Sequence, residues 1–120
     1  QQNGKLGDAI AAHREAVRLA RDAKGEGAAG ILLFPPTPFM WGAQLKPDMV
    51  IRHVSEVAAG ADVPIIVFEY PPASGIGYAP ETLARLCEIP QVAAVKDCDF
   101  CTMSLIAPTI AVASSSALLL

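Results

Sequence analysis

The fold is decided by two stretches of sequence, Val63-Pro64-Ile65-Ile66-Val67-Phe68-Glu69-Tyr70-Pro71-Pro72-Ala73-Ser74-Gly75 and Pro90-Gln91-Val92-Ala93-Ala94-Val95-Lys96-Asp97. Each contains a short apolar run rich in valine or isoleucine, which is typical of a buried parallel strand. Between them lies a helix-sized segment, Pro80 to Glu88. The order strand, helix, strand predicts a βαβ unit. Chemistry in such units is found where strands end and loops begin, and Tyr70 and Lys96 both fall there.

The rest of the chain continues this alternation. Apolar residues at helical spacing predict helices, and short apolar runs predict strands. Proline at the first position and aspartate in the first turn favour a helix beginning at Pro47. The elements expected in chain order are a turn over 1–7, a helix over 8–25, a strand over 29–34, a helix over 47–60, strands over 63–68 and 92–96 around the helix at 80–88, a connector over 97–108 and a fourth strand over 109–113.

Composition narrows the class of protein. The chain has 120 residues, of which 52% are apolar and 18% charged. This balance fits one small α/β domain with buried strands, and it also fits a piece of a larger domain. A net charge of -3 without a basic cluster argues against a nucleic-acid partner. Three cysteines are an odd count for a disulfide framework, and the single pair Cys98 and Cys101 is a weak metal or redox signal, so we expect no metal and no cofactor.

Targeting and membrane signals are a further consideration. The first residues do not have the pattern of a signal peptide, so we expect none. Pro108 and the serines at 114–116 interrupt the apolar C-terminal segment, which argues against a transmembrane helix. We therefore expect a cytoplasmic protein without a membrane partner.

Two features are given structural interpretations. His13 and His53 each lie at helical spacing among apolar residues, so both are interpreted as packed helix residues. The stiff proline loop that begins at Pro35 leads into the apolar cluster Phe39-Met40-Trp41. This cluster either packs under another element or a neighbouring subunit, or it forms a wall of a pocket.

The candidate site lies at the strand ends. Lys96 ends a buried strand, where desolvation disfavours the ammonium, and a neutral amine can attack a ketone or aldehyde to form a Schiff base. The alternative is an ordinary surface lysine. Tyr70 is a candidate proton shuttle and Glu69 a second acid–base candidate. Ser74 and Gly75 offer a hydroxyl and backbone donors to a carboxylate.

These segments resemble a known family. Residues 64–75 and the strand Val92-Ala93-Ala94-Val95-Lys96-Asp97 are similar to the dihydrodipicolinate synthase / N-acetylneuraminate lyase family of Schiff-base aldolases. The helix over 79–86 and the strand over 30–36 also resemble it, and the likeness runs from about Leu6 to Asp97. The resemblance implies that the chain is one partial domain, the central part of a (β/α)8 TIM barrel. A small doubly wound α/β sheet is the alternative fold.

The chain departs from the family pattern at several positions. The family's catalytic tyrosine aligns with Phe68, its asparagine with Glu69, and its turn arginine with Ala73. The second tyrosine of the family's proton relay aligns with Thr37, which we take as a substrate-binding candidate with Ser74 and Gly75. The threonine-rich loop that binds the keto-acid carboxylate would precede residue 1.

The resemblance implies a lyase or synthase that forms an imine between Lys96 and pyruvate or another 2-oxo acid, with Tyr70, or else Glu69, moving protons. It also implies a homo-oligomer. A sugar-acid dehydratase that uses the same lysine is one alternative, and a non-catalytic remnant is another.

Overall fold

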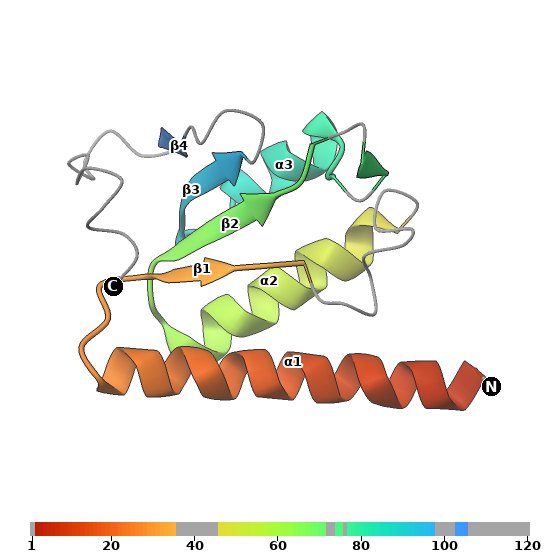
Figure 1. The fold of residues 1–120 in the computed structure, drawn as a ribbon, viewed down its shortest axis with the longest axis horizontal. Helices are drawn as coiled ribbons and strands as arrows, with labels where there is room; N and C mark the ends of the chain where they lie inside the picture. The colour runs from red at the N-terminus through yellow and green to blue at the C-terminus, as the bar shows by residue number, and fades with distance from the viewer. Residues whose placement is uncertain (1, 36–45, 72–73, 76, 98–102, 106–120) are drawn as a thin grey trace.

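The computed structural model describes residues 2–35, 46–71, 74–75, 77–97 and 103–105. The elements are α1 (Gln2–Gly25), β1 (Ile31–Leu33), α2 (Pro47–Ala61), β2 (Ile65–Glu69), α3 (Pro80–Cys87), β3 (Val92–Asp97) and β4 (Met103–Leu105) (Figure 1). The predicted alternation of helices and strands is therefore confirmed as far as β3.

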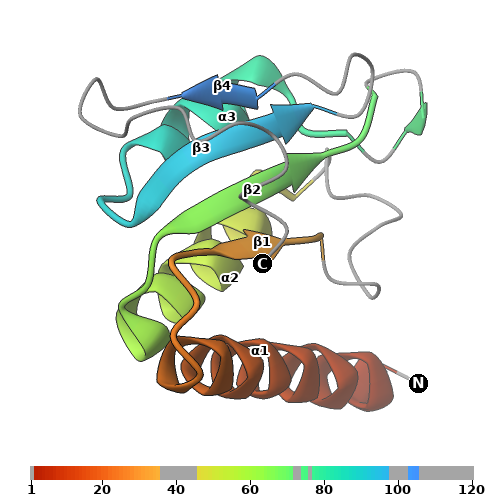
Figure 2. The same ribbon diagram turned by 60° about the vertical axis from the view of Figure 1, so that its left-hand side comes forward.

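Three parallel strands stand side by side in the order in which the chain makes them. The sheet order is β1-β2-β3-β4, with β1 parallel to β2 and β2 parallel to β3. Figure 2 shows α2 and α3 behind the sheet, and α1 running alongside α2 at the β1 end. Among the described residues no helix covers the opposite face, whereas a doubly wound sheet has helices on both faces.

The hydrophobic core lies between the sheet and the helices. Alternate residues of β2 point to opposite faces, so Ile65 and Val67 face the helices while Ile66 and Phe68 face away. Ile65 and Val67 are fully buried against α2, α3 and the end of α1. The core cluster consists of Ala20, Val50, Val54, Val57, Ala58, Ala61, Val63, Ile65, Val67, Tyr78, Leu86 and Val92.

Basic side chains of α1 complete the C-terminal end of α2. The last carbonyls of a helix lack partners within the helix. Arg21 Nε donates to the Gly60 oxygen at 2.6 Å, and Lys24 Nζ donates to the Asp62 oxygen at 2.7 Å. Asp62 itself adopts a left-handed conformation (φ 48°) and ends α2 one residue later than its glycine predicts.

Two expectations at the ends of the chain need correction. Residues 2–7 were expected to form a turn but belong to α1, because no proline or strong cap stops the helix from extending towards Gln2. Part of the segment expected as a connector is β4, which pairs antiparallel with β3. The strand expected at 109–113 lies outside the described residues.

Candidate active site

A row of three side chains crosses the sheet at the C-terminal ends of its parallel strands. Phe68 of β2 pairs in register with Lys96 of β3. Leu33 pairs with Val67, which places Phe34 next to Phe68. Neighbouring residues in register point to the same face of a sheet, so Phe34, Phe68 and Lys96 all project from the face opposite the helices. We call this set the Phe34–Phe68–Lys96 row.

Ring contacts hold this row together. The rings of Phe34 and Phe68 stack with centroids 4.5 Å apart and an interplanar angle of 25°. Lys96 Nζ lies over the Phe68 ring, 5.4 Å from its centroid. An ammonium within about 6 Å of an aromatic face is attracted by the ring quadrupole. Phe68 is almost fully buried, whereas Phe34 is half exposed.

Tyr70 lies next to this row. It follows β2 directly, and its ring meets the Phe68 ring edge to face with centroids 5.0 Å apart. Gly77 makes this placement possible, since a Cβ there would stand 2.5 Å from the Tyr70 carbonyl oxygen. The backbone of Gly77 therefore lies tightly against that of Tyr70.

Glu69 belongs to the other side of the sheet. It is buried, and the alternation of β2 directs it to the helix-covered face with Val67. The pKa of Tyr78 is raised well above its usual value, chiefly because burial disfavours the phenolate and further because of electrostatic interactions with Glu69 and Tyr70. Tyr78 belongs to the core cluster. The structure thus brings Tyr70 and Lys96 to Phe68 and places Glu69 near Tyr78.

Two hydrogen bonds join Ser74 to Pro71 in the segment predicted to bind a carboxylate. Ser74 Oγ donates to the Pro71 oxygen at 2.6 Å, and the Ser74 backbone N–H donates to the same oxygen at 2.9 Å. Gly75 adopts a positive φ of 75°, which a residue with a Cβ rarely tolerates. Both Ser74 donors are directed into the turn, so binding a carboxylate through the hydroxyl requires the side chain to rotate. Thr37 lies outside the described residues, as do Phe39, Met40, Trp41 and the pair Cys98 and Cys101.

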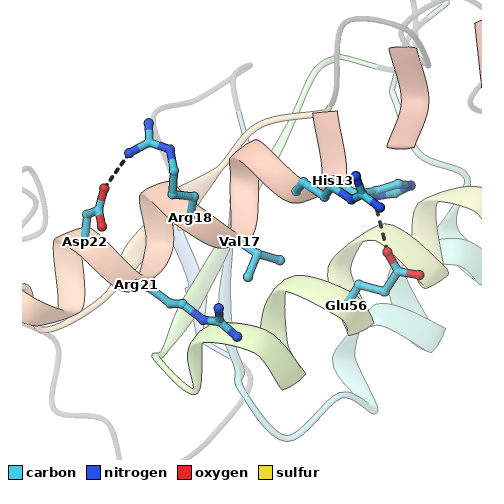
Figure 3. Close-up of a pocket in the computed structure, with 7 residues that line it drawn as sticks. His13, Val17, Arg18, Arg21, Asp22 and Glu56 are labelled. Carbon is cyan, nitrogen blue, oxygen red and sulfur yellow. Dashed lines mark hydrogen bonds and ion pairs between the residues drawn. The ribbon is translucent and has the colours of Figure 1, made fainter. Parts of the chain in front are cut away.

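A second cluster of titratable groups lies between α1 and α2 (Figure 3). His13 Nδ1 and His53 Nδ1 are 2.5 Å apart, and His13 Nδ1 is 3.7 Å from a Glu56 carboxylate oxygen. At this separation one imidazole donates a hydrogen bond and the other accepts it. Burial, with a smaller effect of His13, lowers the pKa of His53 to about 4. An open pocket of about 390 Å³ lies beside His13, between Arg14, Val17, Arg18, Arg21 and Glu56 among others.

The sequence pattern predicted that Tyr70 and Lys96 lie at strand ends. It did not predict the contacts of the Phe68 ring or the contact between His13 and His53. The place of Phe68 in the row depends on strand register, which only pairing reveals. The contact between His13 and His53 joins residues 40 positions apart on two helices. Their common position on apolar helix faces was the one available signal.

Within the part of the chain that the structure describes, no group of three or more histidine, cysteine or acidic residues could hold a metal ion. No helix in that part is long and apolar enough to cross a membrane.

Parallel strands with helices on one face define an α/β protein, and its candidate site is the strand end that carries Lys96. The sequence comparison then gives the family. The model of the dihydrodipicolinate synthetase family matches residues 9–119, and the chain belongs to this family.

Curated relatives agree with the family assignment. The chain is 36% identical to a 4-hydroxy-tetrahydrodipicolinate synthase of Acidiphilium cryptum over 86 residues, which are 72% of this chain and 28% of that protein. It is 39% identical to a protein with the same name from Nitratidesulfovibrio vulgaris over 85 residues, 70% of this chain and 28% of that protein. The chain thus spans little more than a quarter of the length of these relatives. No solved structure matches the chain.

Proposed function

We propose that this chain carries the imine-forming lysine of a synthase or lyase that acts on pyruvate or another 2-oxo acid. The position of Lys96 supports the proposal: it lies at the C-terminal end of a parallel strand, on the face opposite the helices and in register with Phe68. In this mechanism the Lys96 amine attacks the ketone carbon, the carbonyl oxygen leaves as water, and a carbon–nitrogen double bond forms. Family membership at the level of a synthase or lyase agrees with this chemistry.

The proton transfers are assigned to Tyr70. Its ring contacts Phe68, which in turn lies against Lys96. Glu69, the other candidate, is directed towards Tyr78 on the helix side, and this position favours Tyr70. We further assign the carboxylate of the 2-oxo acid to the turn at Ser74 and Gly75. Thr37 is a binding candidate through the family resemblance alone.

We propose that the chain is the central segment of a TIM barrel. Three parallel strands in sequential order, with helices on one face, support this fold over a doubly wound sheet. The antiparallel β4 departs from the barrel pattern. A barrel requires further strands beside β1, which is the edge of the described sheet.

Reductive trapping tests the proposed function. The chain is incubated with pyruvate and cyanoborohydride, which reduces a protonated imine to a stable secondary amine, and the adduct is weighed by mass spectrometry. Lys96→Ala should abolish the rapid adduct, whereas the matched variant Lys46→Ala, which removes an exposed lysine, should retain it. A rapid adduct that survives in Lys96→Ala contradicts the assignment. No rapid adduct in either the parent chain or Lys46→Ala favours a non-catalytic protein.

A further inference from the structure

The aromatic ring of Phe68 lies beside the Lys96 nitrogen. Nζ lies 5.4 Å from the ring centroid, and Phe34 stacks against the same ring at 4.5 Å. A phenyl ring has no hydroxyl, so it neither donates nor accepts a proton. It does present an electron-rich face, which attracts a cation.

We propose that the face of the Phe68 ring stabilises the positive charge of the imine formed at Lys96 and so holds that imine in its protonated form. This inference rests on the proposed function. Protonation makes the imine carbon electrophilic and allows the adjacent carbon to lose a proton, because the nitrogen then accepts the electron pair. A neutral imine is a much weaker electron sink. Phe68 would therefore act directly on the reacting nitrogen, which lies over its ring at 5.4 Å from the centroid.

The balance of the step is simple. The neutral Lys96 amine, the ketone and one proton give the protonated imine and one water molecule. Cyanoborohydride then transfers a hydride to the imine carbon and leaves a secondary amine. No metal or other co-reactant is required.

Few other charged groups on the strands could stabilise the positive charge of the imine in place of the Phe68 ring. The described residues of β1 and β4 include no charged or titratable side chain. On β2, Glu69 is directed to the helix side, and Tyr70 follows the strand next to Phe68. On β3, Lys96 is the one charged residue before Asp97, and the backbone of Asp97 pairs in register with Glu69. The charged residues of α3, Glu81 and Arg85, belong to the helix layer behind the sheet.

Fluorination of Phe68 tests the proposal without changing the size of the ring much. Mono-, di- and trifluorophenylalanine are placed at position 68, and trapping of pyruvate at Lys96 is measured by peptide mapping as a function of pH. Because cyanoborohydride reduces only the protonated imine, the alkaline limb of the profile reports its loss of a proton. We expect that limb to move stepwise to lower pH as fluorines are added. A contribution of the size usual for a cation–π contact corresponds to a total shift of about 0.4 to 1.5 pH units.

Lys46 serves as the internal control in the same samples, because it is exposed and lies at the start of α2. Its alkaline limb should not move when Phe68 is fluorinated. Phe68→Leu should shift the Lys96 limb at least as far as the trifluoro ring, and Phe68→Tyr, which restores an electron-rich face, should return it to the parent value. A Lys96 limb that stays in place across the fluorinated series overturns the inference while leaving the imine itself established. Absence of trapping at Lys96 in the parent chain would instead overturn the proposed function and the inference together.

Discussion

Lys96 Nζ lies 5.4 Å from the centre of the Phe68 ring, and the two residues are register partners on adjacent parallel strands. Pairing in register fixes the spacing of the two backbones at about 4.8 Å, so both side chains start from rigid strands rather than from a loop. Stacking against Phe34 restrains the ring further. The contact therefore belongs to the framework of the site.

Removing the Tyr70 hydroxyl tests the assignment of the proton shuttle. Tyr70→Phe keeps the ring contact with Phe68 but cannot move protons. We expect exchange of the pyruvate methyl protons with deuterated water, followed by NMR, to slow by about 10²- to 10⁴-fold, while trapping at Lys96 persists.

Glu69→Gln is the matched comparison for that experiment, because Glu69 is directed to the opposite face of the sheet. Its exchange rate should stay close to that of the parent chain. If Glu69→Gln loses exchange and Tyr70→Phe keeps it, the roles of the two residues must be reversed.

Gly77 is predicted to control the position of Tyr70. A Cβ at residue 77 would lie 2.5 Å from the Tyr70 carbonyl oxygen and 3.1 Å from that of Pro71, both of them backbone atoms. Gly77→Ala should therefore lower the free energy of unfolding by about 1–3 kcal/mol, as overpacking does, and slow methyl exchange. Gly25→Ala is the control, because a Cβ there meets nothing within 4 Å. Equal urea midpoints for the parent and Gly77→Ala chains would show that the loop accommodates the methyl group.

Acid should weaken the contact between α1 and α2. His53 is buried, and its pKa is lowered from 6.5 to about 4 in the folded chain. The unfolded chain takes up a proton on His53 at a higher pH than the folded chain does. The contribution of His53 to the free energy of unfolding is therefore complete above about pH 6.5 and falls as the pH approaches about 4. The loss at the acid end is at most about 3 kcal/mol.

Urea unfolding followed by circular dichroism between pH 4 and 8 measures this loss. Replacing His53 with leucine should flatten the profile over this range. A parent profile that is already flat would show that the histidine pair does not couple protonation to the packing of α1.

The edge of the sheet beside α1 is predicted to cause self-association. β1 lies at the edge of the sheet that the described residues form, and Leu19 and Phe34 are 53% and 49% exposed beside a groove of about 580 Å³. Unpaired strand edges and exposed apolar groups favour association. Leu19→Glu should reduce the apparent mass in sedimentation, whereas Glu26→Lys, an exposed charge change outside the groove, should not. A parent chain that sediments as a monomer at all concentrations contradicts this prediction.

The sequence predicted the βαβ unit well because buried parallel strands read as continuous apolar runs. The limits of α2, α3 and β3 were placed within one residue, since prolines and glycines mark them. β4 was missed because a short antiparallel strand carries no periodicity of its own. Sequence alignment identified Phe68 as a position without a hydroxyl, but only strand register placed its ring against Lys96. The burial of Glu69 on the helix side was not predicted, because the apolar run ends at Phe68 and an acidic residue after it is typical of a loop, whereas Glu69 is the last residue of β2.

Peptide mapping after trapping with pyruvate is the most direct test of the central claim, that Lys96 forms the imine. The chain has four lysines, at positions 5, 24, 46 and 96, so one digest compares all of them under identical conditions. Lys24 already donates to the Asp62 oxygen, and Lys46 is exposed, which makes them internal references. We predict that reduced pyruvate appears first on Lys96, with the other lysines labelled only slowly. Labelling of all four lysines at similar rates would contradict the claim.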